Sequence, residues 1–233
     1  MTHCPHQGPA RRLKAMRTLA ATVAASSVVA LSSMSLTGCK PSGSDASTAA
    51  SGTASAAQSA LSFNAVDITG AKYARQLQLT DVDGKPRSLA DFKGKVVFLF
   101  FGYTQCPDVC PTTMAELAAV RKKLGADGDQ IQGVFVTVDP DRDTPQVLKA
   151  YLSAMDPSFV GLTGTREQID AATKDFKVFY QKVPGKAEGS YTIDHTAGAF
   201  VFDRDGQVRL FVRYGMGAEP LAADLKQLLN SFE

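Results

Sequence analysis

The sequence predicts an α/β sandwich that forms a single domain. The continuous apolar runs "KVVFLFF" and "IQGVFVTV" are typical of strands buried on both faces of a sheet. Such runs alternate with longer segments of helical spacing, and the chain closes with a hairpin and a helix. Hydrophobic residues make up 44% of the chain, which is ample for the core of one domain.

The first 61 residues are predicted to precede this domain. Residues 1–38 have the order of an export signal: a basic segment, an apolar Ala/Ser-rich run, and "LTGC", which ends at Cys39 and resembles the lipobox of bacterial lipoproteins. An ordinary cleaved signal or an uncleaved anchor is the alternative. Residues 39–61 are expected to form a Ser/Ala/Gly-rich flexible tether, from a lipidated Cys39 to a domain over residues 62–233. This order predicts a lipid-anchored protein of the bacterial cell membrane, with its domain on the extracytoplasmic side.

The charge balance gives no indication of nucleic-acid binding. The formal net charge is +2, but four bases and no acid precede residue 39. Of 25 Lys and Arg residues, 21 therefore remain against 23 acids in the rest of the chain. This slightly acidic remainder lacks the basic patch that nucleic acid or an anionic membrane surface would require.

The first elements of the domain are a hairpin, a strand and a helix. Residues 75–92 show an alternating run, a turn at Asp83-Gly84 and a second extended piece, which predicts a hairpin. The buried strand over residues 95–101 follows. Residues 112–124 then have helical spacing and stop before a glycine.

The second buried strand, over residues 131–138, leads into a second helix within residues 139–155. Either Asp143 or Thr144 is suited to the N-cap of this helix, since both side chains can accept a hydrogen bond from the first turn. Pro145 fits that turn because its missing N–H group is not needed there.

Three further segments complete the predicted domain. Residues 164–183 support a third helix, and residues 197–214 give two strands around a turn at Asp205-Gly206. Residues 220–232 form an amphipathic closing helix.

Cys106 and Cys110 lie where the strand over residues 95–101 meets the following helix. Cys4 lies in the export segment and Cys39 is expected to carry lipid, so this pair remains. If the pair spans one helical turn, a Cα separation of about 6 Å permits a disulfide, and a helix N-terminus favours the thiolate. A proline after each cysteine predicts a stiff loop or single turn. A structural disulfide gains little from so short a loop, whereas a redox pair and a metal site stay open.

His195 is the histidine of the mature chain, because His3 and His6 precede the lipobox. It stands just before a predicted strand, and neighbouring parallel strands that end at one edge would bring it to the cysteine loop. A lone histidine is also often a plain surface or hydrogen-bonded residue. Two cysteines and one histidine with an open position suit copper, zinc or another borderline metal, and two thiolates favour Cu(I).

Three motifs occur in order over about residues 62 to 233: "FGYTQCPDVCPTT", "VDPDRDTP" and "YTIDHTAGAFVFDRDG". Together they resemble the Sco/SenC family of thioredoxin-like copper proteins. The resemblance implies a thioredoxin-like sandwich with an N-terminal β-hairpin extension, and copper, as Cu(I), Cu(II) or both, bound through Cys106, Cys110 and His195. It also implies a membrane-tethered protein that assists assembly of the dinuclear copper centre of cytochrome c oxidase subunit II, by metal delivery, by reduction of that centre's cysteines, or by both. Other copper chaperones or a thioredoxin-like reductant are further implied partners.

The sequence leaves the roles of several residues near Cys106, Cys110 and His195 undecided. Asp194 can orient His195 or cap a loop, and Asp139 ends a strand near the expected site. Helix capping is favoured for Asp143. Thr196 stands where many relatives of the family have serine, and it retains the hydroxyl. "HTAGAFVF" lacks the proline that reductive thioredoxin-like proteins usually place before this strand, which favours a metal site over a general reductase.

Three hypotheses follow for the function. The first is a copper chaperone, not primarily an enzyme, that transfers copper by ligand exchange with an associated thiol redox step. The second is a periplasmic thiol-disulfide oxidoreductase or peroxide-handling enzyme, in which one cysteine attacks and the other resolves. The third is a copper sensor or store without a client oxidase. The binding and redox hypotheses share Cys106 and Cys110, so only His195 separates them.

Overall fold

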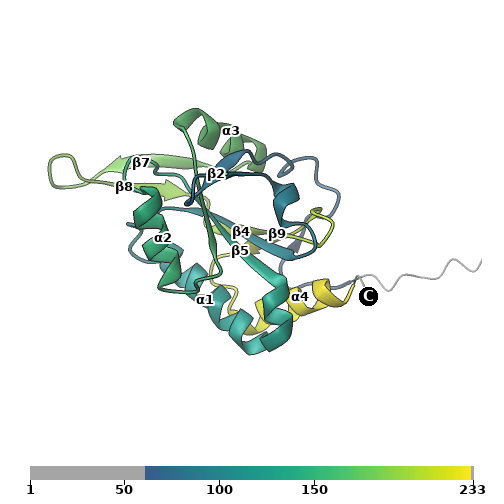
Figure 1. The fold of residues 1–233 in the computed structure, drawn as a ribbon. Coiled ribbons are helices and arrows are strands. Elements are labelled where there is room, and N and C mark those ends of the chain that lie inside the picture. Colours follow the sequence, from purple (N-terminus) through teal and green to yellow (C-terminus); the bar gives the residue numbers. More distant parts are fainter. Residues whose placement is uncertain (1–60, 232–233) are drawn as a thin grey trace, which may run out of the picture. The chain divides into compact units, whose positions relative to one another are not determined.

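A mixed sheet of eight strands forms the centre of the fold in the computed structural model, which describes residues 61–231 (Figure 1). The strands are β1 (Val66–Asp67), β2 (Leu79–Asp81), β3 (Pro86–Arg87), β4 (Val96–Gly102), β5 (Ile131–Thr137), β6 (Val160–Thr163), β9 (Gly198–Phe202) and β10 (Val208–Arg213). They are ordered β1-β10-β9-β4-β5-β6-β2-β3 across the sheet.

The two apolar runs of the sequence form the central pair β4 and β5, as predicted. Every residue of β4 is buried, and its parallel register with β5 pairs Val96 with Ile131 and Gly102 with Thr137. On its other side, β4 pairs with β9 in the antiparallel direction. The carboxyl end of β4 therefore lies beside the beginning of β9.

Within residues 61–231, four α-helices cover the two faces of this sheet. They are α1 (Val109–Leu124), α2 (Pro145–Ser153), α3 (Arg166–Phe176) and α4 (Ala218–Asn230). In Figure 1, α1, α2 and α4 lie on one side of the central strands and α3 lies on the other. Successive β4 side chains point to opposite faces of the sheet. Phe101 packs against Phe176 of α3, with ring centroids 5.1 Å apart. Phe100 packs against Phe135 of β5 on the other face. The predicted α/β sandwich is confirmed.

The segment after α3 differs from the prediction of one helix over residues 164–183. The helix ends at Phe176, and Lys177 takes a left-handed conformation with φ of 56°. The β-branched and aromatic residues that follow favour extended backbone. They begin β7 (Tyr180–Pro184), which pairs with β8 (Tyr191–His195) in a separate two-stranded sheet.

The predicted hairpin at the start of the domain is confirmed. Strands β2 and β3 pair around Gly84, whose φ of +82° suits a glycine. The predicted signal segment (1–38) and all but the last residue of the predicted tether (39–61) lie outside the described residues. Within residues 61–231, no helix is long and apolar enough to cross a membrane.

Candidate metal centre

The cysteine loop joins the end of β4 to the beginning of α1. The backbone N–H of Cys106 donates to the carbonyl of Tyr103 at 3.3 Å, which closes a turn. The helix begins at Val109, earlier than predicted, because Pro111 falls within the first turn, where no intrahelical donor is needed. Cys110 is therefore in the first turn of α1, and Cys106 lies in the loop before it.

The two thiols are free and differ in exposure: Cys106 is partly buried and Cys110 is fully buried. The Cys110 sulfur lies against Gly102, where an added Cβ would be only 2.9 Å away. Burial raises the pKa of the Cys110 thiol well above its usual range. The Cys106 sulfur instead accepts the backbone N–H of Cys110 at 3.4 Å.

His195 ends β8 with its ring turned toward the sulfurs. Its Nδ1 lies 3.1 Å from the Thr196 carbonyl, which can only accept, so Nδ1 carries the proton. Nε2 is then free to accept, and it lies 3.3 Å from the Cys110 sulfur. Burial lowers the pKa of His195, and the Thr196 carbonyl and the charge of Asp194 oppose this shift. The ring is thus held neutral, in the tautomer that a metal ligand requires.

The backbone carbonyl of Thr196, rather than the side chain of Asp194, orients the His195 ring. Asp194 is exposed, and the proton on the His195 ring points to the carbonyl of Thr196. The Thr196 side chain adds support, since its Oγ1 accepts the backbone N–H of Phe179 at 3.0 Å while its own N–H donates to the Phe179 carbonyl at 2.9 Å.

The structure brings the three predicted site residues together. The ligand atoms of Cys106, Cys110 and His195 all lie within 4.8 Å of one another. The sequence argument for this meeting was wrong in one respect, because it assumed parallel strands. The strand β9, which follows His195, runs antiparallel to β4. The beginning of β9, and not its end, therefore lies beside the carboxyl end of β4, where the cysteine loop starts.

Asp143 is not the helix cap that the sequence favoured. Thr144 fills that position, with its side chain accepting from Val147 N, and Pro145 follows as predicted. The buried Asp143 carboxylate instead accepts the backbone N–H and hydroxyl of Thr104, at 3.0 and 2.6 Å, and the Thr137 hydroxyl at 2.6 Å. Asp143 therefore fastens the cysteine loop to the end of β5.

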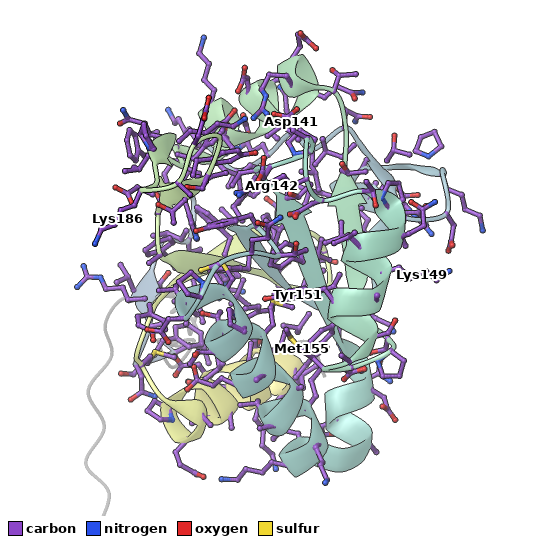
Figure 2. All side chains as sticks on the ribbon, turned by 90° about the vertical axis from the view of Figure 1, so that its left-hand side faces the viewer. Asp141, Arg142, Lys149, Tyr151, Met155 and Lys186 are labelled. Carbon is purple, nitrogen blue, oxygen red and sulfur yellow. The ribbon has the colours of Figure 1, made fainter. Side chains whose placement is uncertain are left out.

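The donor set suits a soft metal ion. Two sulfurs and one neutral imidazole nitrogen match the preferences of copper, and the partly exposed Cys106 leaves access from solvent. The hydroxyl of Tyr151, labelled in Figure 2, is buried without a hydrogen-bond partner among the described residues. Burial raises the pKa of the Tyr151 hydroxyl.

Sequence reasoning missed three supports of the site. Thr104 and Gly102 stand close to the cysteines in the sequence, and a glycine at the end of a buried strand is a signal of close approach by another group. Arg142 lies within the "DPDRD" motif, but nothing in the sequence indicates which side chains it reaches. The strand β8, which carries His195, was absent from the prediction.

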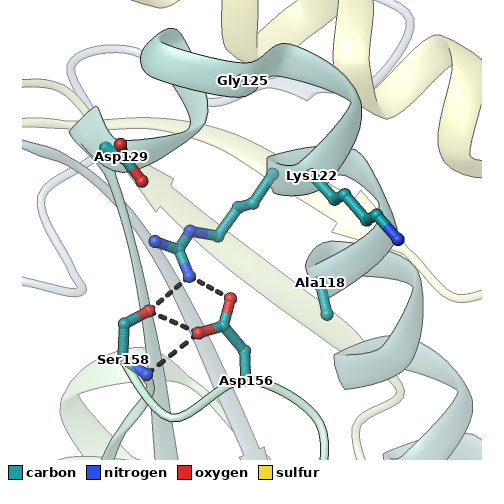
Figure 3. A pocket seen from close by; sticks show the side chains of 7 residues that line it. Ala118, Lys122, Gly125, Asp129, Asp156 and Ser158 are labelled. Carbon is teal, nitrogen blue, oxygen red and sulfur yellow. Dashed lines mark hydrogen bonds and ion pairs between the residues drawn. The ribbon is translucent and has the colours of Figure 1, made fainter.

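A separate pocket lies far from these residues (Figure 3). It has a volume of about 430 Å³ and is lined by Ala118, Arg121, Lys122, Gly125, Asp129, Asp156 and Ser158. Arg121 is already paired with Asp156 and Ser158. The pocket lies at the C-terminal end of α1, whereas Cys110 lies in its first turn. It takes no part in the candidate site.

Comparison with known proteins gives consistent matches over the described fold. The family described as SCO1/SenC matches residues 66–230. The chain is 43% identical to the structure of Bradyrhizobium japonicum ScoI with copper bound, covering 66% of this chain and 97% of that one with a TM-score of 0.60. A SCO1/SenC family lipoprotein from Bacillus anthracis is 30% identical, covering 67% and 97% of the two chains, with a TM-score of 0.54. "Protein SCO2 homolog, mitochondrial" of Mus musculus is 34% identical over 156 residues, which span 66% of this chain but only 61% of the mouse protein.

Proposed function

Because the chain belongs to the SCO1/SenC family, we propose that it is a copper chaperone whose ligands are Cys106, Cys110 and His195. The observation that carries this proposal is the convergence of two cysteine sulfurs and the free Nε2 of a neutral histidine within 4.8 Å. The copper-bound ScoI structure, which is 43% identical to this chain, supports copper as the metal. The client is cytochrome c oxidase subunit II, in which the chaperone assists assembly of the dinuclear copper centre.

In this proposal copper is bound temporarily and then passed to another protein, and the arrangement of the ligands favours this exchange. The ligands come from a loop, a helix and a strand, and Cys106 is accessible at the rim. A thiolate of another copper chaperone or of the client can therefore approach before the last ligand of this protein departs. Cys110 must lose its proton when the metal binds, so copper affinity should rise with pH.

The same two sulfurs support thiol-disulfide reduction of the client as a second activity. Cys106 is the more exposed of the two cysteines, which favours its sulfur as the attacking group. Its attack on a client disulfide forms a mixed disulfide and releases one client thiolate. Cys110 then attacks Cys106, releases the second client thiolate and leaves a Cys106–Cys110 disulfide, so two electrons pass to the client. A thioredoxin-like reductant must restore the pair.

Copper titration beside a disulfide-exchange assay tests the proposal on His195→Ala and the unchanged protein. We expect about one copper per reduced chain for the unchanged protein. The variant should keep thiol exchange and lose much of its copper affinity, most of all for Cu(II), because Cu(II) prefers nitrogen ligands more than Cu(I) does. Unchanged copper binding with a collapse of thiol exchange would instead support the oxidoreductase hypothesis.

We further propose that residues 1–38 are a lipoprotein signal and that Cys39 carries the lipid that anchors the protein to the bacterial cell membrane. The family lipoprotein from Bacillus anthracis supports this arrangement. Residues 39–61 would then tether a domain over residues 62–233 on the extracytoplasmic side. Cys39→Ser should release the protein from the membrane fraction without altering the copper stoichiometry of the domain. Full membrane retention with the unprocessed mass would refute the lipid anchor.

A further inference from the structure

Arg142 is a side chain that contacts both halves of the candidate metal centre. Its Nη1 donates to the Gln105 side-chain carbonyl at 3.1 Å, and Gln105 directly precedes Cys106. The same nitrogen donates to the backbone carbonyl of Tyr191 at 2.9 Å. Tyr191 begins β8, the strand that ends at His195. One guanidinium group therefore joins the cysteine loop to the strand that carries the histidine.

The guanidinium group is itself held firmly. Its Nε pairs with the fully buried carboxylate of Asp139, and that carboxylate also accepts the Tyr191 hydroxyl at 2.8 Å. The Arg142 guanidinium lies over the Tyr191 ring, 3.5 Å from its centroid. Each of the residues Arg142, Asp139 and Tyr191 thus contacts the other two. Only 20% of the Arg142 side chain is exposed, so these contacts are screened less by water than those of a surface ion pair.

This attachment matters because β7 and β8 form a sheet of their own. Among the described strands they pair only with each other, and the eight-stranded sheet does not include them. Near its middle, β8 is further held by the Ile193 N–H, which donates to the Tyr103 hydroxyl at 3.2 Å. In Figure 2, Arg142 lies beside Asp141 and between Lys186, in the turn of this hairpin, and helix α2, which carries Lys149 and Tyr151.

We propose that Arg142 is a positioning residue that holds the β7–β8 hairpin against the cysteine loop and so fixes the distance between His195 and the two sulfurs. The inference rests on the proposed copper site. If Arg142 is lost, the two cysteines keep their places on the loop and α1, whereas the histidine moves more freely with its hairpin. Cu(II), which depends on the nitrogen ligand, should then be affected more than Cu(I), which two thiolates can hold.

The first test compares copper affinities of the purified full chain and three variants. Arg142→Ala should weaken Cu(II) binding by about tenfold or more, the range expected for supporting residues, and should change Cu(I) binding by less than about threefold. Arg142→Lys should resemble Arg142→Ala, because a single ammonium lacks the planar fork that spans several acceptors. Arg87→Ala is the matched control, since it removes an Arg–Asp pair of similar burial from the β2–β3 hairpin. It should leave both affinities unchanged.

Full recovery in Arg142→Lys would show that charge alone is needed, and it would overturn the positioning role. Equal losses for Cu(I) and Cu(II) would do the same, because they would point to general damage. Unchanged affinities in Arg142→Ala would also contradict the proposal.

The second test uses the metal-free protein, so it does not depend on the proposed function. Amide hydrogen exchange in β8 should accelerate by about tenfold or more in Arg142→Ala, while exchange in β4 stays the same. Arg87→Ala should leave both strands unchanged. If the unchanged protein failed to bind copper but β8 exchange responded in this way, the proposed function would fail and the attachment of the hairpin by Arg142 would stand. An unaltered β8 exchange rate would overturn the attachment itself.

Discussion

Gly102 determines how closely the Cys110 sulfur can approach the sheet. A Cβ at this position would lie 2.9 Å from that sulfur, 2.9 Å from the Phe100 ring and 3.0 Å from the Phe135 ring. None of these groups has room to retreat, because all three residues are buried in the core.

Gly102→Ala should therefore displace the sulfur and lower the free energy of unfolding by about 1–3 kcal/mol, as overpacking of a filled core does. Copper affinity should fall at the same time. Chemical denaturation and copper titration of the reduced variant check both effects. A stable variant with native copper affinity would show that the sulfur is not confined by the sheet.

The neutral state of His195 gives the metal-free protein a pH dependence of known sign. Burial lowers the pKa of His195 in the folded protein, so the unfolded chain binds the proton more readily. The contribution of this residue to stability should be complete above about pH 6.5, the ordinary pKa of histidine, and should decrease as the pH falls below it.

Denaturation of the metal-free protein between about pH 5 and pH 8 measures this contribution. The unchanged protein should lose more stability over the acidic half of the range than His195→Ala does, because the variant lacks the titrating ring. Identical pH profiles would mean that the ring is as easily protonated in the folded protein as in the unfolded chain.

At the scale of the elements, Asp143 links the loop that precedes Cys106 to the end of β5. Three donors from Thr104 and Thr137 share its buried carboxylate. Burial raises the pKa of Asp143, while these hydrogen bonds oppose the shift, so the fold does not strongly require the charged form.

Asp143→Ala should lower the free energy of unfolding by about 2 kcal/mol, because the buried Thr137 hydroxyl and two partly buried donors of Thr104 lose their acceptor. Asp143→Asn keeps one acceptor oxygen and should cost less near neutral pH. The two variants are compared by chemical denaturation, and copper affinity should follow the same order. Equal stability of the Ala and Asn variants would show that the acceptor oxygens of Asp143 do not stabilise the cysteine loop.

The elements differ in how far the sequence predicts them. The central strands were predictable because β4 is buried throughout and β5 almost throughout, so both read as predominantly apolar runs. The hairpin of β7 and β8 was not, because Ile193 is the one fully buried residue of its two strands and its polar pattern resembles the end of a helix. The start of α1 was misplaced for a local reason: Pro111 breaks a helix only beyond the first turn.

At the scale of the whole molecule, Asp224 of α4 secures the segment through which the chain enters the domain. Its buried carboxylate accepts the backbone N–H and side-chain amide of Asn64, at 2.9 and 2.8 Å, and the backbone N–H of Ala65 at 2.8 Å. Residues near the two ends of the described chain are thereby joined.

Asp224→Ala should lower the free energy of unfolding by about 2–3 kcal/mol, since hydrogen bonds to a buried charged group are among the stronger ones. Asp129→Ala, at an exposed position, is the control and should have little effect. Denaturation curves of both variants provide the measurement. Equal curves would show that the entry segment contributes nothing to the stability of the domain.

The fold class and the composition of the candidate site were both accessible from the sequence. Strand and helix periodicity predicted the sandwich, and the few cysteines and histidines of the predicted domain reduced the candidate ligands to Cys106, Cys110 and His195. The relative placement of these residues was not accessible from periodicity, because it depends on the antiparallel direction of β9 and on the contact of Arg142 with Tyr191, which are 49 positions apart in the sequence.

The separation of β8 from the main sheet also bears on how long a metal ion stays bound. Two of the proposed ligands belong to the loop and helix at the end of a fully buried strand, and the third belongs to a hairpin outside that sheet. Opening of the hairpin would break no strand pairing of the eight-stranded sheet, although it would expose the core residue Ile193, so we expect it to be faster than global unfolding. The dissociation rate of an ion that needs all three ligands is then set by hairpin opening, whereas an ion held by the two sulfurs has a residence time set by thiolate exchange. A change in the oxidation state of copper would thus change which motion limits its release.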